Sequence, residues 1–147
     1  MRTMWDGSAR RELQDRLTRL TPTAERRWGS MTAPQMITHL VDAMHMAHGD
    51  IVIPPRKMIL RYTPLKELIL YVLPFPKGAP TAPELISRAP ADWSAECALL
   101  STMLGRFGER DRRGKWPEHP AFGKMSGSQW GVLVYRHTDH HFRQFGV

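Results

Sequence analysis

The sequence has a single cysteine, Cys97, among its 147 residues. No disulfide can form within the chain, so we expect the fold to depend on a hydrophobic core and the location to be reducing and cytoplasmic. The chain also lacks an N-terminal apolar run of signal-peptide length. Its most apolar stretch, residues 58–75, is interrupted by a proline and by charged residues, whereas a membrane span needs about 20 mostly apolar residues. We therefore expect no membrane partner.

Acidic residues are scarcer than basic ones, with 14 Asp and Glu against 21 Lys and Arg, and the net charge is +7. Such a charge raises the question of a nucleic-acid partner. The basic residues are scattered, however, and we find neither an aromatic-interleaved RNA motif nor a compelling recognition helix. We therefore expect a soluble basic surface and no specific nucleic-acid partner. Weak, salt-dependent binding to DNA remains the alternative.

Strand-like alternation is also missing, and leucine, methionine and alanine supply much of the 41% hydrophobic content. This composition favours helices, and the length suits one domain over residues 1–147. We predict an all-α fold, a four-helix bundle with one extra helix. The predicted helices cover about residues 9–20, 33–48, 57–73 with a break at Pro64, 92–107 and 127–144. A long proline-rich loop, residues 74–90, separates the second and third bundle helices.

Two helix starts carry a reciprocal capping pattern. Thr32 precedes Gln35 by three residues, and Ser126 precedes Gln129 by the same spacing. In each pair, the hydroxyl can accept from the backbone of the third helical residue while the glutamine reaches back. Gly49 is expected to end the second helix.

The last helix ends in "YRHTDHHFRQFGV", which contains three closely spaced histidines. At about 100° per residue, two of them continue the apolar stripe of the helix, and the third, His140, lies at its edge. His137 and His141 are four residues apart, so their rings lie one turn above the other. Asp139 is expected to face solvent. The apolar stripe comprises Trp130, Leu133, Val134, His137, His141 and Gln144.

The second predicted helix carries another inward-facing histidine. His39 shares a stripe with Met36, Ala43 and Met46, whereas the two later histidines of this helix point away. If the two helices face each other, His39 can meet His137 and His141. Three neutral imidazoles with an open fourth position form a catalytic type of zinc site, and nickel, iron or copper could also accept it.

The alternative is that these histidines are ordinary core residues bonded to neighbouring oxygens. Two histidines four residues apart seldom hold an ion by themselves, and convergence across helices does not follow from spacing alone. We expect His119 to bond backbone and Cys97 to be a buried core residue. His140 and Gln144 are the two candidates for orienting a ligand imidazole, and the sequence does not choose between them. Trp130 is expected to anchor the core or to line a pocket.

These residues also carry a resemblance to a known superfamily. "HTDHHFRQ" resembles the terminal signature of the DinB/YfiT-like superfamily, and "WGSMTAPQMITHLVDAM" resembles its other half, a capped helix leading to one histidine. The resemblance runs from about Trp28 to the C-terminus and points to an uncharacterised branch with an HHxRQFG-type tail. Where many relatives have "HRGQ", this chain has "HFRQ", so substrate roles at Phe142 and Arg143 are not carried over.

The resemblance implies a four-helix bundle, a homodimer, and a divalent metal held by His39, His137 and His141. Zinc or nickel is expected first, with iron, manganese or copper as alternatives. Characterised relatives include transferases that use low-molecular-weight thiols. We therefore expect a metal-dependent enzyme of that type acting with a thiol on a small molecule. The alternatives are a metal-dependent hydrolase and a non-catalytic metal or small-molecule binding module. No catalytic residue is assigned.

Overall fold

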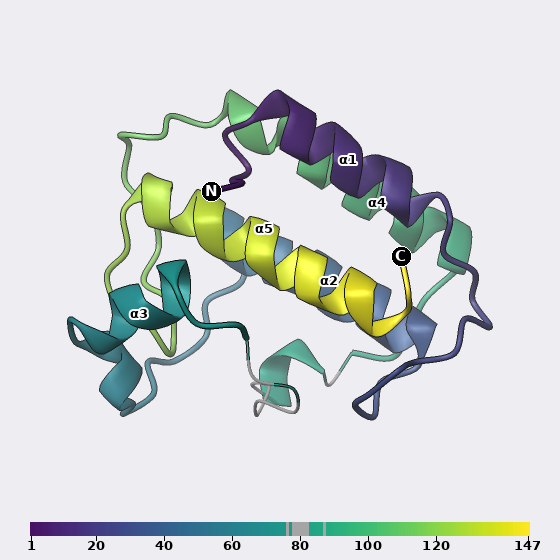
Figure 1. Ribbon diagram of the computed structural model, residues 1–147, viewed down its shortest axis with the longest axis horizontal. Helices are drawn as coiled ribbons and strands as arrows, with labels where there is room; N and C mark the ends of the chain where they lie inside the picture. Colours follow the sequence, from purple (N-terminus) through teal and green to yellow (C-terminus); the bar gives the residue numbers. More distant parts are fainter. Residues whose placement is uncertain (76, 78–82, 87) are drawn as a thin grey trace.

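The computed structural model describes residues 1–75, 77, 83–86 and 88–147, and these residues form helices without a strand (Figure 1). The predicted all-α class is confirmed. The α-helices are α1 (Gly7–Leu17), α2 (Ala33–His48), α3 (Leu65–Tyr71), α4 (Trp93–Arg106) and α5 (Gly127–Gln144), and the short 3-10 helices are η1 (Ile59–Arg61), η2 (Pro83–Leu85) and η3 (Phe107–Glu109).

Four longer helices enclose the core. In Figure 1, α1 lies along α4 and α5 lies along α2, while the short α3 packs near the first turns of α5. The side chains between them are apolar and fully buried, including Leu13, Ile37, Leu100 and Phe142. Burial of such side chains from water is the main stabilising contribution to a fold of this size. Among the described residues, no helix is long and apolar enough to cross a membrane.

Both capping boxes form as predicted. The Thr32 and Ser126 hydroxyls accept from the backbone N–H groups of Gln35 and Gln129, and each glutamine side chain bonds back to the cap. Gly49 ends α2 with a φ of 85°, a left-handed conformation that costs glycine little. The two helices that carry the histidines therefore begin and end where local signals place them.

The third predicted helix is wrong over most of its length. Residues 57–73 were expected to be helical, but only Leu65–Tyr71 forms an α-helix, preceded by η1 and an extended Met58. The backbone of Arg56 instead bonds the carbonyl of Pro120, and Arg61 donates to the same carbonyl. These long-range bonds favour an extended conformation over a helix at the start of this segment.

The first helix is shorter than expected at its end. It begins at Gly7 after an Asp6 cap and stops at Leu17, whereas residues 9–20 were predicted. The fourth helix agrees closely, with Asp92 capping Trp93–Arg106 and η3 continuing the chain.

The proline-rich segment 74–90 lies partly outside the described residues, namely at 76, 78–82 and 87. Its described part includes η2, which packs on α2, and Arg88, which forms ion pairs with Asp42 of α2 and Glu96 of α4. Both carboxylate side chains are buried. The end of this segment is therefore fixed to α2 and α4.

Candidate metal centre

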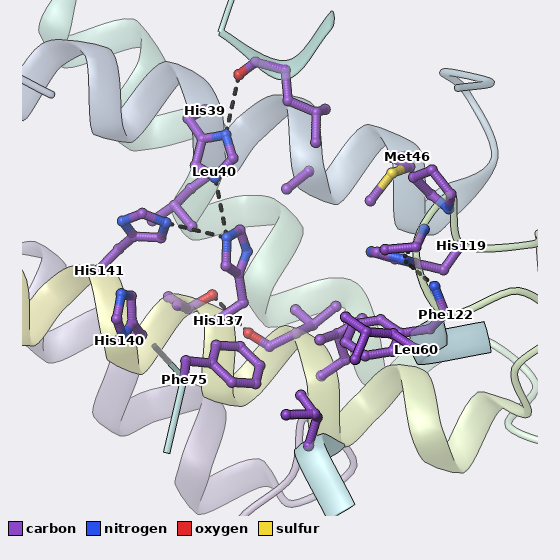
Figure 2. Close-up of a pocket in the computed structure, with 18 of the residues that line it drawn as sticks. His39, Leu40, Met46, Leu60, Phe75, His119, Phe122, His137, His140 and His141 are labelled. Atoms are coloured by element: carbon purple, nitrogen blue, oxygen red, sulfur yellow. Dashed lines mark hydrogen bonds between the residues drawn. The ribbon is translucent and has the colours of Figure 1, made fainter. Parts of the chain in front are cut away.

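The two helices α2 and α5 bring the three predicted histidines together. His137 and His141 lie on the buried face of α5, one turn apart, and His39 faces them from α2 (Figure 2). His39 and His141 are buried, while His137 lines a pocket and is partly accessible. The convergence that spacing could only suggest is thus present in the fold.

The geometry of the cluster suits a cation. His137 Nε2 lies 3.1 Å from His39 Nε2 and 3.1 Å from His141 Nε2. All three ligand atoms lie within 4.8 Å of one another. Nitrogens bound tetrahedrally to zinc at about 2.0–2.1 Å would lie roughly 3.3 Å apart. The cluster could therefore accept a metal ion with small side-chain movements.

Two outer partners fix which nitrogen faces the centre. His39 Nδ1 lies 3.1 Å from the Leu85 carbonyl oxygen, and His141 Nδ1 lies 2.9 Å from Gln144 Oε1. Both partners are acceptors, so each Nδ1 carries the proton and each Nε2 presents its lone pair. The Gln144 orientation is consistent, because its amide Nε2 donates to the Trp28 carbonyl at 2.6 Å.

This arrangement leaves more nitrogen lone pairs than N–H donors at the centre of the cluster. A proton on His137 Nε2 can bond to one neighbouring lone pair but not to both His39 and His141. A metal ion at the centre would satisfy all three lone pairs at once. The donor set therefore fits a cation better than it fits a histidine hydrogen-bond network.

Burial keeps the imidazoles neutral. Burial lowers the pKa of His39, and burial together with the neighbouring histidines lowers the pKa of His137 well below its ordinary value. The pKa of His141 falls to about 3, through burial first and then through the nearby His39. Metal ions bind neutral imidazole, so these shifts keep the binding form present at neutral pH.

Of the two candidate orienting residues, Gln144 is the one that forms a hydrogen bond with a histidine of the cluster. Gly29 packs against the Gln144 amide, and a Cβ there would lie 2.4 Å from the amide nitrogen. Gly29 also has a φ of 80°, which disfavours other residues. Sequence reasoning missed Gly29 and the carbonyls of Leu85 and Trp28, since backbone acceptors leave no signal in residue identity.

The other pocket candidates have different surroundings. His140 is half-buried beside Trp28, with ring centroids 5.8 Å apart, and takes no part in the three-histidine cluster. Trp130 is fully buried and donates its indole N–H to the Pro117 carbonyl at 3.1 Å. Both residues line the pocket. The prediction that Trp130 anchors the core is confirmed.

The remaining histidines are engaged elsewhere. His119 Nδ1 accepts from the backbone N–H groups of Ala121 and Phe122, at 3.1 and 3.2 Å, as expected for a turn. His45 lies 2.9 Å from a carboxylate oxygen of Asp50. His48 packs edge-on to Phe107. None of the three belongs to the cluster.

Two predictions require correction. Asp139 does not face solvent, because its carboxylate pairs with the buried Arg16 of α1 at 2.7 Å. Cys97 is only half-buried at the edge of the core rather than within it. Burial and the nearby Glu96 raise the pKa of its thiol to about 11, so the protonated form dominates at neutral pH.

A large pocket opens onto the histidine cluster. Its volume is about 1020 Å³, and its walls come from α2, α5, the η1–α3 segment and the turn at His119. Among the described residues, no aspartate or glutamate lines it. Its apolar lining includes Met31, Leu40, Ala43, Met44, Met46, Met58, Leu60, Ile69, Phe75, Leu85, Phe122, Leu133 and Val134.

Fold and site together define a helical protein whose buried three-histidine cluster, at the wall of an apolar pocket, could hold a metal ion. The chain belongs to the family described as "Protein of unknown function (DUF1569)", whose model matches residues 8–146. No curated protein and no solved structure matches the chain.

Proposed function

We propose that the protein binds a divalent metal through His39, His137 and His141 and is a metal-dependent enzyme acting with a low-molecular-weight thiol. One observation carries the proposal: three imidazole Nε2 atoms converge beside a pocket large enough for a small molecule. A bound divalent cation would lower the pKa of a coordinated thiol and stabilise the thiolate for attack. The superfamily resemblance of the histidine motifs supports this reaction type.

The chain's own groups support a thiol-dependent reaction in three ways. The outer acceptors on His39 and His141 aim two lone pairs at one point. The apolar pocket limits competing water, which strengthens interactions with a charged nucleophile. Cys97 lies outside the pocket lining and has a raised pKa, so the nucleophile would come from a second molecule.

Hydrolysis is less well supported. Water activated by a metal is most effective with a nearby carboxylate base. Among the described residues that line the pocket, none is acidic, and Asp139 is held by Arg16 instead. A non-catalytic binding module is the other outcome, and it differs in whether an added thiol reacts.

The test is a thiol titration of cobalt-substituted protein. We expect a cysteine-like thiol to change the visible spectrum in a saturable manner, because the pocket leaves the cluster accessible from one side. The same titration of His45→Ala should be unchanged, since that ring pairs with Asp50. A cobalt spectrum that no exogenous thiol or small anion alters would overturn the enzyme proposal and leave a closed, structural site.

A further inference from the structure

The pocket has two polar ends. Figure 2 shows the histidine cluster at one end and His119, beside Met46, Leu60 and Phe122, at the other. The walls between them are apolar, and four methionines take part in the lining. Methionine side chains adapt to varied ligand shapes. The pocket therefore suits an elongated apolar molecule rather than a compact polar one.

The tautomer of His119 follows from its contacts. Two backbone N–H groups, those of Ala121 and Phe122, donate to Nδ1, which must therefore carry a lone pair. Burial, with the charge of Arg61, also lowers the pKa of this histidine to about 3, so the ring is neutral. The proton of a neutral ring with an unprotonated Nδ1 lies on Nε2.

That Nε2–H donor has no acceptor within the part of the chain that the structure describes. The ring packs against Trp130 and Phe122, with centroids 5.4 and 5.0 Å away, so it has little freedom to turn. In Figure 2 the ring points into the pocket, away from the backbone groups that bond Nδ1. The ring is partly exposed, and Nε2 is not among the fully buried unpartnered atoms of the described residues, so this donor is open to an acceptor oxygen of a bound ligand.

The charges around the pocket determine which head group suits the end at the histidine cluster. Lys77 lines the pocket over the Trp28 ring, near His140, whereas Arg56 is paired with Glu84, and no described lining residue is acidic. A metal ion at the cluster would add further positive charge. An anionic or lone-pair head group is therefore favoured at the histidines, and a cationic ligand is disfavoured.

We propose that His119 is a ligand-binding residue whose Nε2–H donates to an acceptor oxygen at the far end of an elongated, apolar, anionic ligand. The head-group part rests on the proposed function, whereas the hydrogen bond of His119 does not depend on the metal. This assigns the ligand class as an apolar body with an anionic or thiolate head and a carbonyl-like distal group.

The test compares two series of probes on zinc-loaded protein by calorimetry. One series is phenylalkanoates of increasing chain length, and the other is their para-acetyl counterparts, which add one distal carbonyl. At the chain length that spans the pocket, we expect the acetyl probe to bind about three- to tenfold more tightly than its parent, the range for one neutral hydrogen bond.

His119→Asn is the matched variant. An asparagine oxygen can still accept from the two backbone N–H groups, so the turn is retained, but the side chain cannot reach the Nε2 position. We expect the acetyl advantage to disappear while the parent's Kd stays within about twofold. No acetyl advantage at any chain length, or an advantage that persists in His119→Asn, would overturn the proposal.

A second measurement needs no variant. In ¹⁵N-histidine-labelled wild-type protein, the His119 Nε2–H resonance should shift with the acetyl probe and stay in place with its parent. Failure of the metal proposal is distinguishable, because His137→Ala would then bind no less zinc than the wild type. The acetyl advantage, which depends on His119, should survive in that variant.

Discussion

Neutral imidazoles in the folded state make stability depend on pH. His39, His119, His137 and His141 all have pKa values lowered by burial. In the unfolded chain their pKa values return to about 6.5. As pH falls below that value, the unfolded state binds protons that the folded state does not, so the free energy of unfolding decreases.

For His119 and His141, whose folded-state pKa is about 3, the predicted loss for metal-free protein is about 1 kcal/mol per pH unit each. Urea unfolding between about pH 6.5 and 5, above the range where most carboxylates titrate, measures it. The decrease continues towards the folded-state pKa, which is about 3 for His119 and His141. A flat unfolding free energy across that window would contradict neutral, buried rings.

Gln144 is the residue whose loss should loosen the cluster without removing a ligand. Gln144→Leu removes the acceptor for His141 Nδ1 and the donor to the Trp28 carbonyl. Losing an outer partner of a metal ligand typically weakens metal binding about 10- to 100-fold. A competitive zinc titration checks this.

The control is Gln14→Leu, which removes a comparable side-chain bond to the Ser101 carbonyl between α1 and α4. Its zinc affinity should match that of the wild type. Equal affinities for the two variants would show that Gln144 does not orient His141.

Individual residues were predictable where identity carries the signal. Three histidines on inward-facing stripes of α2 and α5 could be found from helical spacing, and so could Gln144 near His141. Asp139 was misplaced because a helical wheel shows direction but not the neighbour in that direction. Here the neighbour is the buried Arg16 of another helix.

Local sequence determines where α5, the helix that carries His137 and His141, begins. Ser126→Ala removes one half of the capping box of α5. We expect the unfolding free energy to fall by about 1 kcal/mol, the usual cost of losing such a cap. Chemical denaturation measures it, and zinc stoichiometry should not change, because the cap lies more than two turns from His137.

Ser94→Ala is the comparison, since Ser94 is exposed on α4 and is not its N-cap. The same destabilisation in both variants would refute a specific role for the cap.

Elements were predictable where caps and periodicity agree, as in α2, α4 and α5. The η1–α3 segment was not, although its residues have good helix propensity. The backbone of Arg56, just before this segment, and the Arg61 side chain both bond the Pro120 carbonyl, more than fifty residues away. Contacts of that kind override local propensity and cannot be read from a short window. The same η1–α3 segment contributes Leu60 and Ile69 to the pocket, so the pocket was not predictable either.

At the scale of the whole molecule, Arg88 fixes to α2 and α4 the segment whose backbone carbonyl bonds His39. It pairs with the buried carboxylates of Asp42 and Glu96, and Leu85, three residues earlier, supplies the carbonyl to His39 Nδ1. Arg88→Ala would leave two buried acids without their shared cation. We expect about 2–3 kcal/mol of destabilisation, reduced from the fully buried case because Arg88 is itself partly exposed.

Arg56→Ala is the matched control, because Arg56 pairs with Glu84 of the same segment at the surface. Surface pairs contribute about 0–1 kcal/mol. Thermal or urea unfolding of both variants compares them. Equal small effects would mean that the Arg88 pairs do not hold this segment to the helices.

The most direct test of the central claim is the zinc content of untagged protein after saturation and removal of excess metal. We predict about one zinc per chain in the wild type and in His140→Ala, whose ring lies beside the cluster but outside it. His39→Ala, His137→Ala and His141→Ala should each lose tight binding, because two histidines seldom hold an ion. Equal zinc content in all of these proteins, with folding intact, would contradict the claim that the three histidines form a metal centre.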